Sequence, residues 1–145
     1  MIQQIYSSVP HHYRYELNKD FQFAAAHFIP DEAAGHCARL HGHTYFCNIT
    51  IGGDELDRTG FLANFSEIKK LIHGRFDHSS LNEHLELFPG DVPERYPTTE
   101  NVARTIAELV QAYLDGKGNG AVCLQVFLRE TPTSYVVYRP KAGRP

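Results

Sequence analysis

The chain has 145 residues, of which 42% are hydrophobic, and a formal net charge of −3 at pH 7. This length is enough for one hydrophobic core, so we expect a single domain over residues 1–145 with its core at about 13–139. The negative charge and the scattered Lys and Arg residues argue against nucleic acid as a partner. No apolar run reaches the roughly 18 residues that span a bilayer, and no signal-peptide pattern opens the chain, so we expect a cytoplasmic protein without a membrane partner.

Two stretches with a period of two residues predict the first strands. From residue 13 to residue 27, apolar side chains such as Phe21 and Phe23 alternate with polar ones. The stretch HTYFCNITI, residues 43–51, alternates in the same way, and Gly52-Gly53 is expected to close the strand. We therefore expect a long hairpin, half of which faces the core.

The second half of the chain predicts two helices and then two further strands. Ser66 can cap a helix whose apolar positions lie on one face, and Thr98 or Thr99 can cap a longer helix that runs to about residue 116. The strands AVCLQVFLRE and SYVVYRP follow, joined by the short connection TPT. The expected order is ββααββ, an α+β fold with an antiparallel four-stranded sheet and two helices free to cover one of its faces.

Three histidines are candidates for a metal site. His41 and His43 are two residues apart, so both imidazoles project from the same side of an extended strand. His27 ends the preceding strand, and hairpin pairing would bring it to the same place. Three imidazoles without a fourth protein ligand are typical of a catalytic Zn²⁺ that keeps one position open. An isolated His-x-His pair is more often fortuitous, so the third histidine is what favours a metal.

Three further positions carry reactive groups whose roles the residues alone leave open. Cys37 precedes His41 by four residues and could be a fourth zinc ligand, a buried apolar residue or a thiolate base. Asp77-His78 is either an acid–histidine pair or two ordinary turn residues. Glu130, at the end of an expected strand, can cap a turn or accept two hydrogen bonds from a guanidine-like edge of a ligand. These residues favour a zinc-dependent enzyme without naming its reaction.

The chain's cysteine usage is consistent with a reducing compartment. Three cysteines, Cys37, Cys47 and Cys123, are an odd number at long spacings, which argues against a secreted disulfide framework. Cys47 and Cys123 fall within expected strands, so we interpret both as small core residues.

An ordered set of motifs carries a resemblance to a known family. FAAAH, CARLHGH, FDHSSLN, PTTEN and RETPTSY occur in this order between about residues 21 and 138. Together they resemble the 6-pyruvoyltetrahydropterin synthase family, most closely its bacterial branch of 6-carboxytetrahydropterin synthases in queuosine biosynthesis. The three residues between Cys37 and His41 match the spacing of that branch. One departure is Asn64-Phe65, where the family often has aspartate and phenylalanine.

The resemblance implies roles for the candidate residues. By this resemblance, zinc is expected to bind to the three histidines named above, and Cys37 is expected to be the base. Asp77 and His78 are expected to complete a proton-transfer triad, and Glu130 is expected to anchor the pterin. The implied substrate is 7,8-dihydroneopterin triphosphate, which the implied carbon–carbon lyase converts to 6-carboxytetrahydropterin with release of triphosphate and acetaldehyde.

The resemblance also implies an architecture and leaves two alternatives. The fold is the tunnelling fold, a ββααββ unit that assembles into an oligomeric barrel, with trimers stacked as homohexamers. Unpaired sheet edges give a physical motive for such assembly. The first alternative is a 6-pyruvoyltetrahydropterin synthase acting on the same substrate. The second is a non-catalytic domain stabilised by zinc, in which Cys37 closes a four-ligand site.

Overall fold

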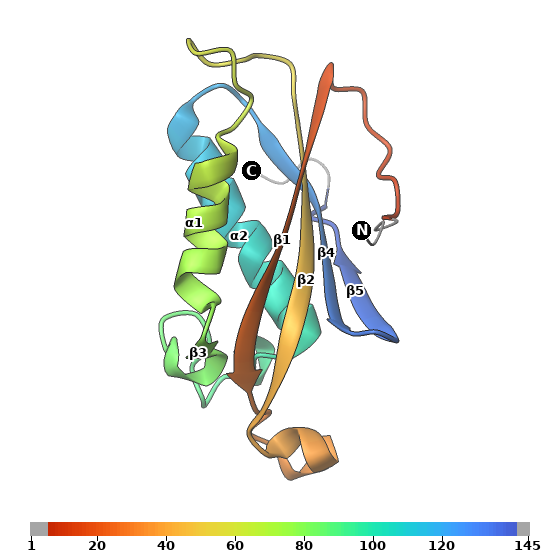
Figure 1. Ribbon diagram of the computed structural model, residues 1–145, viewed down its shortest axis with the longest axis vertical. Coiled ribbons are helices and arrows are strands. Elements are labelled where there is room, and N and C mark those ends of the chain that lie inside the picture. Colours follow the sequence, from red (N-terminus) through yellow and green to blue (C-terminus); the bar gives the residue numbers. More distant parts are fainter. Residues whose placement is uncertain (1–5, 142–145) are drawn as a thin grey trace.

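The computed structural model describes residues 6–141 of the chain. A sheet forms one layer, and two helices form a second layer on one face of that sheet (Figure 1). The helices are α1 (Phe65–Phe76) and α2 (Thr99–Lys117). The strands are β1 (Tyr15–His27), β2 (His41–Gly53), β3 (Ser79–Ser80), β4 (Val122–Thr131) and β5 (Ser134–Tyr138). Three short 3₁₀ helices are η1 (Glu32–Ala38), η2 (Leu81–Glu83) and η3 (Pro93–Arg95).

The sheet has five strands in the order β3-β1-β2-β4-β5, which corrects the expected count of four. The four expected strands are present and pair antiparallel with their neighbours. The extra strand, β3, has two residues and pairs parallel with β1, through Ala25 with Ser79 and Ala26 with Ser80. A two-residue strand is too short to show a periodicity, so the sequence pattern could not predict it.

The β1–β2 hairpin pairs without interruption along both strands. Its register runs from Tyr15 opposite Gly53 to His27 opposite His41. As predicted, Gly52 and Gly53 close β2, and both still pair with β1. A Cβ atom on Gly53 would lie 2.5 Å from the Cδ1 atom of Leu62, so glycine here permits close packing against the loop that follows.

The core lies between the helices and one face of the sheet. The predicted alternation holds, because Phe23, Tyr45 and Ile49 are at most 1% exposed. Ile68 of α1 and Ile106 of α2 are fully buried in the same core. Each side chain of this kind stabilises the fold by about 1.5–3 kcal/mol relative to an exposed position.

The helix starts differ in part from the predicted ones. Thr98 caps α2, one of the two predicted candidates, and its side chain accepts a hydrogen bond from the Asn101 amide. The prediction that Ser66 caps α1 is wrong. Asn64 is the N-cap and accepts a hydrogen bond from the Glu67 amide. Asn64 stands where the resembled family often has aspartate. Since Asn and Asp are similarly good caps, asparagine at this position preserves the start of α1.

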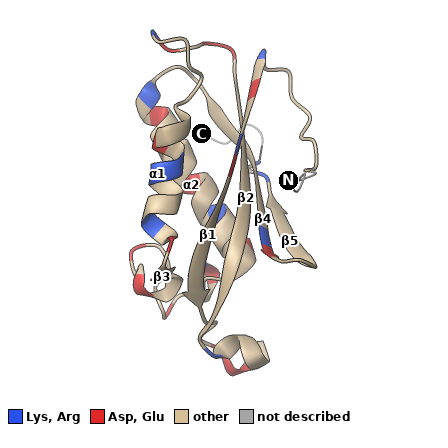
Figure 2. Cartoon of the chain, in the orientation of Figure 1, with Lys and Arg blue, Asp and Glu red and all other residues tan. Residues whose placement is uncertain are grey.

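Charged residues of both signs are spread over the helices and loops (Figure 2). Between residues 6 and 141, no helix combines the length and the hydropathy needed to cross a membrane.

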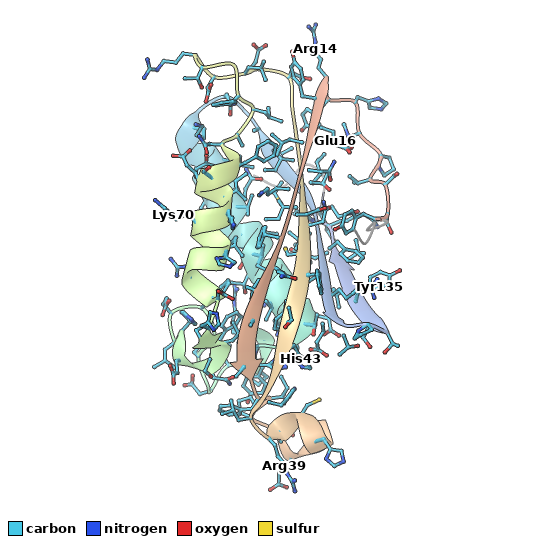
Figure 3. The ribbon with its side chains drawn as sticks, viewed as in Figure 1. Arg14, Glu16, Arg39, His43, Lys70 and Tyr135 are labelled. Atoms are coloured by element: carbon cyan, nitrogen blue, oxygen red, sulfur yellow. The ribbon has the colours of Figure 1, made fainter. Side chains whose placement is uncertain are left out.

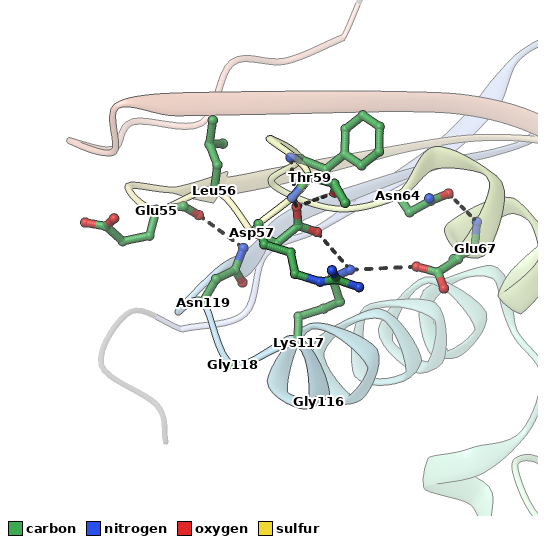
Figure 4. Close-up of a pocket in the computed structure, with 12 residues that line it drawn as sticks. Glu55, Leu56, Asp57, Thr59, Asn64, Glu67, Gly116, Lys117, Gly118 and Asn119 are labelled. Carbon is green, nitrogen blue, oxygen red and sulfur yellow. Dashed lines mark hydrogen bonds and ion pairs between the residues drawn. The ribbon is translucent and has the colours of Figure 1, made fainter.

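A hollow of about 830 Å³ lies where β2 ends, at the opposite end of the hairpin from the three histidines (Figure 4). Polar side chains that line this hollow form hydrogen bonds and ion pairs with one another. The Asp57 carboxylate accepts hydrogen bonds from the Thr59 hydroxyl and the Phe61 amide, and it lies 3.1 Å from the Lys117 Nζ atom. Asp57 therefore connects the loop after β2 to the end of α2.

We predict that Asp57 contributes to the pH dependence of stability. Its hydrogen bonds, above all from the Thr59 hydroxyl, hold the pKa of the Asp57 carboxyl well below its usual range. A lowered carboxyl pKa stabilises the folded state above the unfolded pKa of about 4, and this contribution is lost as the pH falls through the folded value. The Asp57→Asn variant should melt at a lower temperature than the wild type at neutral pH and lose less stability on acidification. Asp91→Asn, at an exposed position, is the control, and equal acid sensitivity of all three proteins would contradict the prediction.

Candidate metal centre and active site

The structure brings His27, His41 and His43 together at one end of the hairpin. One ligand nitrogen from each residue can be chosen so that all three lie within 4.8 Å of one another. The ring centroids of His27 and His41 are 4.5 Å apart, and those of His41 and His43 are 4.9 Å apart. The convergence follows from the register, because His27 pairs with His41 and all three odd-numbered residues face the same side of the sheet. Figure 3 shows His43 at this end of the molecule, near Arg39 and η1.

Hydrogen bonds to main-chain carbonyls orient two of the imidazoles. The His27 Nδ1 atom lies 2.7 Å from the Pro97 oxygen, and the His41 Nδ1 atom lies 2.6 Å from the Arg39 oxygen. A carbonyl can only accept, so in both rings Nδ1 carries the proton, and Nε2 of the neutral ring keeps a free lone pair. Outer partners of this kind are typical of histidines that bind metals.

The free nitrogens fit a metal ion. The Nε2 atoms of His27 and His43 are buried and have no hydrogen-bond partner among residues 6–141. Burial lowers the pKa of both histidines, which favours the neutral form that metals bind. Unpaired buried polar atoms are rare in folded proteins, and a cation shared by these nitrogens would satisfy both.

Glu130 borders the histidine cluster. Its Oε2 atom lies 3.7 Å from the His27 Nε2 atom and 3.8 Å from the His43 Nε2 atom. The Thr99 hydroxyl, in the first turn of α2, donates a hydrogen bond to the same oxygen. The carboxylate is thus held beside the cluster by a residue that the sequence suggested only as an alternative helix cap.

Cys37 lies in η1, in the connection between β1 and β2, and its side chain is exposed. Within residues 6–141, the group of side chains placed to share a metal contains only the three histidines. This arrangement favours a centre with an open position over one that Cys37 closes. Cys47 and Cys123 are buried in the core, as predicted.

Asp77 and His78 lie at the β1 edge of the sheet, where α1 ends. The Asp77 Oδ1 atom accepts a hydrogen bond of 2.8 Å from the Ala24 amide, and its Oδ2 atom lies 3.4 Å from the His78 Nε2 atom. The Ala24 amide, followed by the charges of His78 and His73, holds the pKa of the Asp77 carboxyl below its usual range. His78 has a φ of 58°, a strained value for a residue other than glycine, and its side chain is 84% exposed.

A second hollow lies beside His78, along the end of the β1–β2 hairpin. Its volume is about 360 Å³, and its lining includes His43 and His78 together with small residues of β1 and β2. Of the three histidines of the cluster, only His43 lines this hollow, and Asp77 does not line it.

Sequence reasoning missed several groups around the site. His73 lies 3.3 Å from the Asp77 Oδ2 atom, and the Asn82 amide binds the main chain next to His27. Asn82 is the last residue of the motif FDHSSLN, and its position in that motif does not indicate which residue it contacts. The carbonyls of Arg39 and Pro97 act through the main chain, so no residue type could have revealed them.

A comparison with protein families decides the classification. The family model described as 6-pyruvoyl tetrahydropterin synthase matches residues 16–141. The chain belongs to this family. It is 60% identical over 143 residues to the 6-carboxy-5,6,7,8-tetrahydropterin synthase of Bacillus subtilis, covering 99% of this chain and 97% of that protein. It is also 32% identical over 114 residues to the 6-pyruvoyl tetrahydrobiopterin synthase of Drosophila melanogaster, covering 74% of this chain and 64% of that protein.

Solved structures of the 6-pyruvoyl tetrahydropterin synthase family share the fold. The structure of the Caenorhabditis elegans 6-pyruvoyl tetrahydropterin synthase superposes with a TM-score of 0.68 at 23% identity, covering 88% of this chain and 96% of that chain. The predicted tunnelling fold is confirmed as the fold of the chain.

We predict that His41 is needed for metal binding. The His41→Ala variant removes one of three converging nitrogens, so the purified protein should lose most of the single zinc ion expected per chain. Elemental analysis of purified protein measures this directly. His36→Ala, an exposed histidine in the neighbouring η1, is the matched control and should keep its zinc. Full metal content in His41→Ala would refute the site.

Proposed function

We propose that this protein is a zinc-dependent 6-carboxy-5,6,7,8-tetrahydropterin synthase, a carbon–carbon lyase. The substrates are 7,8-dihydroneopterin triphosphate and one water molecule, and the products are 6-carboxytetrahydropterin, acetaldehyde and triphosphate. The identity of 60% to the Bacillus subtilis synthase carries the choice of reaction. The open cluster of three histidines with Glu130 beside it is compatible with that chemistry.

The residues of this chain have two proposed roles, substrate binding and proton transfer. The Glu130 carboxylate binds the two N–H donors on the pyrimidine edge of the pterin. The Cys37 thiolate removes a proton from the substrate side chain, and His78, held by Asp77, returns a proton. A zinc ion held by the three histidines supplies Lewis acidity toward the oxygen atoms of that side chain.

The biological setting is proposed on the same grounds. The reaction belongs to queuosine biosynthesis and takes place in the cytoplasm. The active form is a homo-oligomer, a hexamer made of two trimers, in which the sheet continues across subunits. The β5 strand at one edge and the short β3 strand at the other offer main-chain groups for such pairing.

Product identification tests the proposed reaction. Purified zinc-loaded protein is incubated with 7,8-dihydroneopterin triphosphate. The products are separated and identified by their masses in mass spectrometry. The proposal requires 6-carboxytetrahydropterin together with acetaldehyde. A product that keeps all the side-chain carbons would instead establish a 6-pyruvoyltetrahydropterin synthase. A protein that binds zinc but leaves the substrate unchanged would indicate a non-catalytic domain.

We predict that Cys37→Ala separates catalysis from metal binding. Cys37 lies outside the histidine cluster, so the variant should keep its zinc and its fold. Loss of a general base lowers turnover by about 10²- to 10⁴-fold. Steady-state kinetics and zinc analysis on one preparation measure both effects. Cys123→Ala removes a buried thiol and should keep turnover, whereas loss of zinc from Cys37→Ala would support the closed four-ligand site.

We predict that Glu130→Gln weakens pterin binding. The amide presents a donor where the carboxylate presented an acceptor, and an unpaired donor in the pocket costs on the order of 2–4 kcal/mol. Calorimetric titration with neopterin measures the change in affinity. Glu83→Gln, an exposed position in η2, serves as the control. Equal affinities for wild type and Glu130→Gln would remove Glu130 from the pterin site.

A further inference from the structure

The Asn82 side chain makes two hydrogen bonds to the main chain of Phe28. The Phe28 amide donates to the Asn82 Oδ1 atom, and the Asn82 Nδ2 atom donates to the Phe28 oxygen, both at 2.9 Å. Phe28 directly follows His27, where the pairing of β1 with β2 ends. The amide group thus continues main-chain pairing beyond the last residue of the strand.

These two bonds complete a row of contacts along the edge of β1. At the start of the row, the Ala24 oxygen accepts a hydrogen bond of 2.6 Å from the His78 amide, and the Ala24 amide donates to Asp77. The parallel pairing of β3 with β1 follows at Ala25 and Ala26. Asn82 closes the row at Phe28, so residues 77–82 hold β1 along residues 24–28.

The row extends from Asp77 and His78 to the residue that follows His27. One end of segment 77–82 carries Asp77 and His78, and its other end fixes the chain next to His27. The His27 ring is itself held by the Pro97 oxygen. With Asn82 in place, both the main chain beyond His27 and its ring have fixed partners.

We propose that Asn82 is a positioning residue for the metal centre. It fixes the end of β1 so that the His27 Nε2 atom faces the other two histidines. This inference rests on the proposed metal site, because Asn82 acts through His27 and touches neither metal nor substrate.

The isosteric variant Asn82→Asp tests this role. It keeps one acceptor for the Phe28 amide but places a carboxylate oxygen against the Phe28 carbonyl, so one bond becomes a repulsion. Removal of outer partners of metal ligands costs 10- to 100-fold in affinity, and we expect the Kd for Zn²⁺ to rise about tenfold. Competition with a chromogenic chelator measures this Kd, and the visible spectrum of Co²⁺-loaded protein should change as the ligand geometry loosens.

Asn119→Asp is the matched control, because Asn119 performs the same kind of bridging at the other end of the molecule. Its Nδ2 atom donates to the Glu55 and Leu62 oxygens at 3.1 and 3.0 Å. This variant should lose thermal stability while keeping the wild-type Kd for Zn²⁺ and the wild-type Co²⁺ spectrum. A purely structural role for Asn82 predicts that both variants lose stability and neither changes the metal affinity.

The outcomes separate this inference from the proposed function. Wild-type protein that binds no Zn²⁺ refutes the metal site itself and, with it, the role of Asn82. Wild-type protein that binds Zn²⁺, with Asn82→Asp binding it equally well, overturns the role of Asn82 alone. If Asn82→Asp does not fold, the same titrations on Asn82→Ser decide, since a serine side chain is too short to bridge both Phe28 groups.

Discussion

The register of the β1–β2 hairpin is the constraint on which the rest of the site depends. It places His27 opposite His41 and sends every odd-numbered side chain of both strands to the face that the helices cover. Because side chains alternate along a strand, a shift by one residue would turn one strand's histidines away from the others. The apolar residues on the same face oppose such a shift, since it would expose Phe23 or Tyr45, both almost fully buried. Core packing and ligand placement are therefore fixed by the same pairing.

Much of the fold could be predicted because it rests on periodic patterns. The long strands and α2 have clear periods of two and 3.6 residues, and the structure has all of them. The errors fall where local chemistry decides. Ser66 and Asn64 are both good caps, and only the geometry at the end of the loop selects Asn64. The β3 strand exists because β1 offers it an edge, which is a tertiary effect.

Some parts of the candidate site could be predicted from the residues themselves, and others could not. The meeting of the three histidines follows from residue types and hairpin pairing, whereas roles for Cys37 and Glu130 came from the family resemblance. Contacts made by the main chain or by distant segments left no local signal. The bridge between Asn82 and Phe28 spans 54 residues of chain, and the His27 partner at Pro97 is a carbonyl that any residue would supply.

The division of the site between a paired hairpin and its connection has an evolutionary consequence. The three histidines are held by strand pairing, but Cys37 lies in the exposed connection that spans from residue 28 to residue 40. Connections tolerate insertions and substitutions far better than paired strands do. Mutation can therefore replace the side chain at position 37, or change its reach, without disturbing the three paired histidines. A lineage built on this hairpin can vary one exposed turn while the cluster of three histidines stays constant.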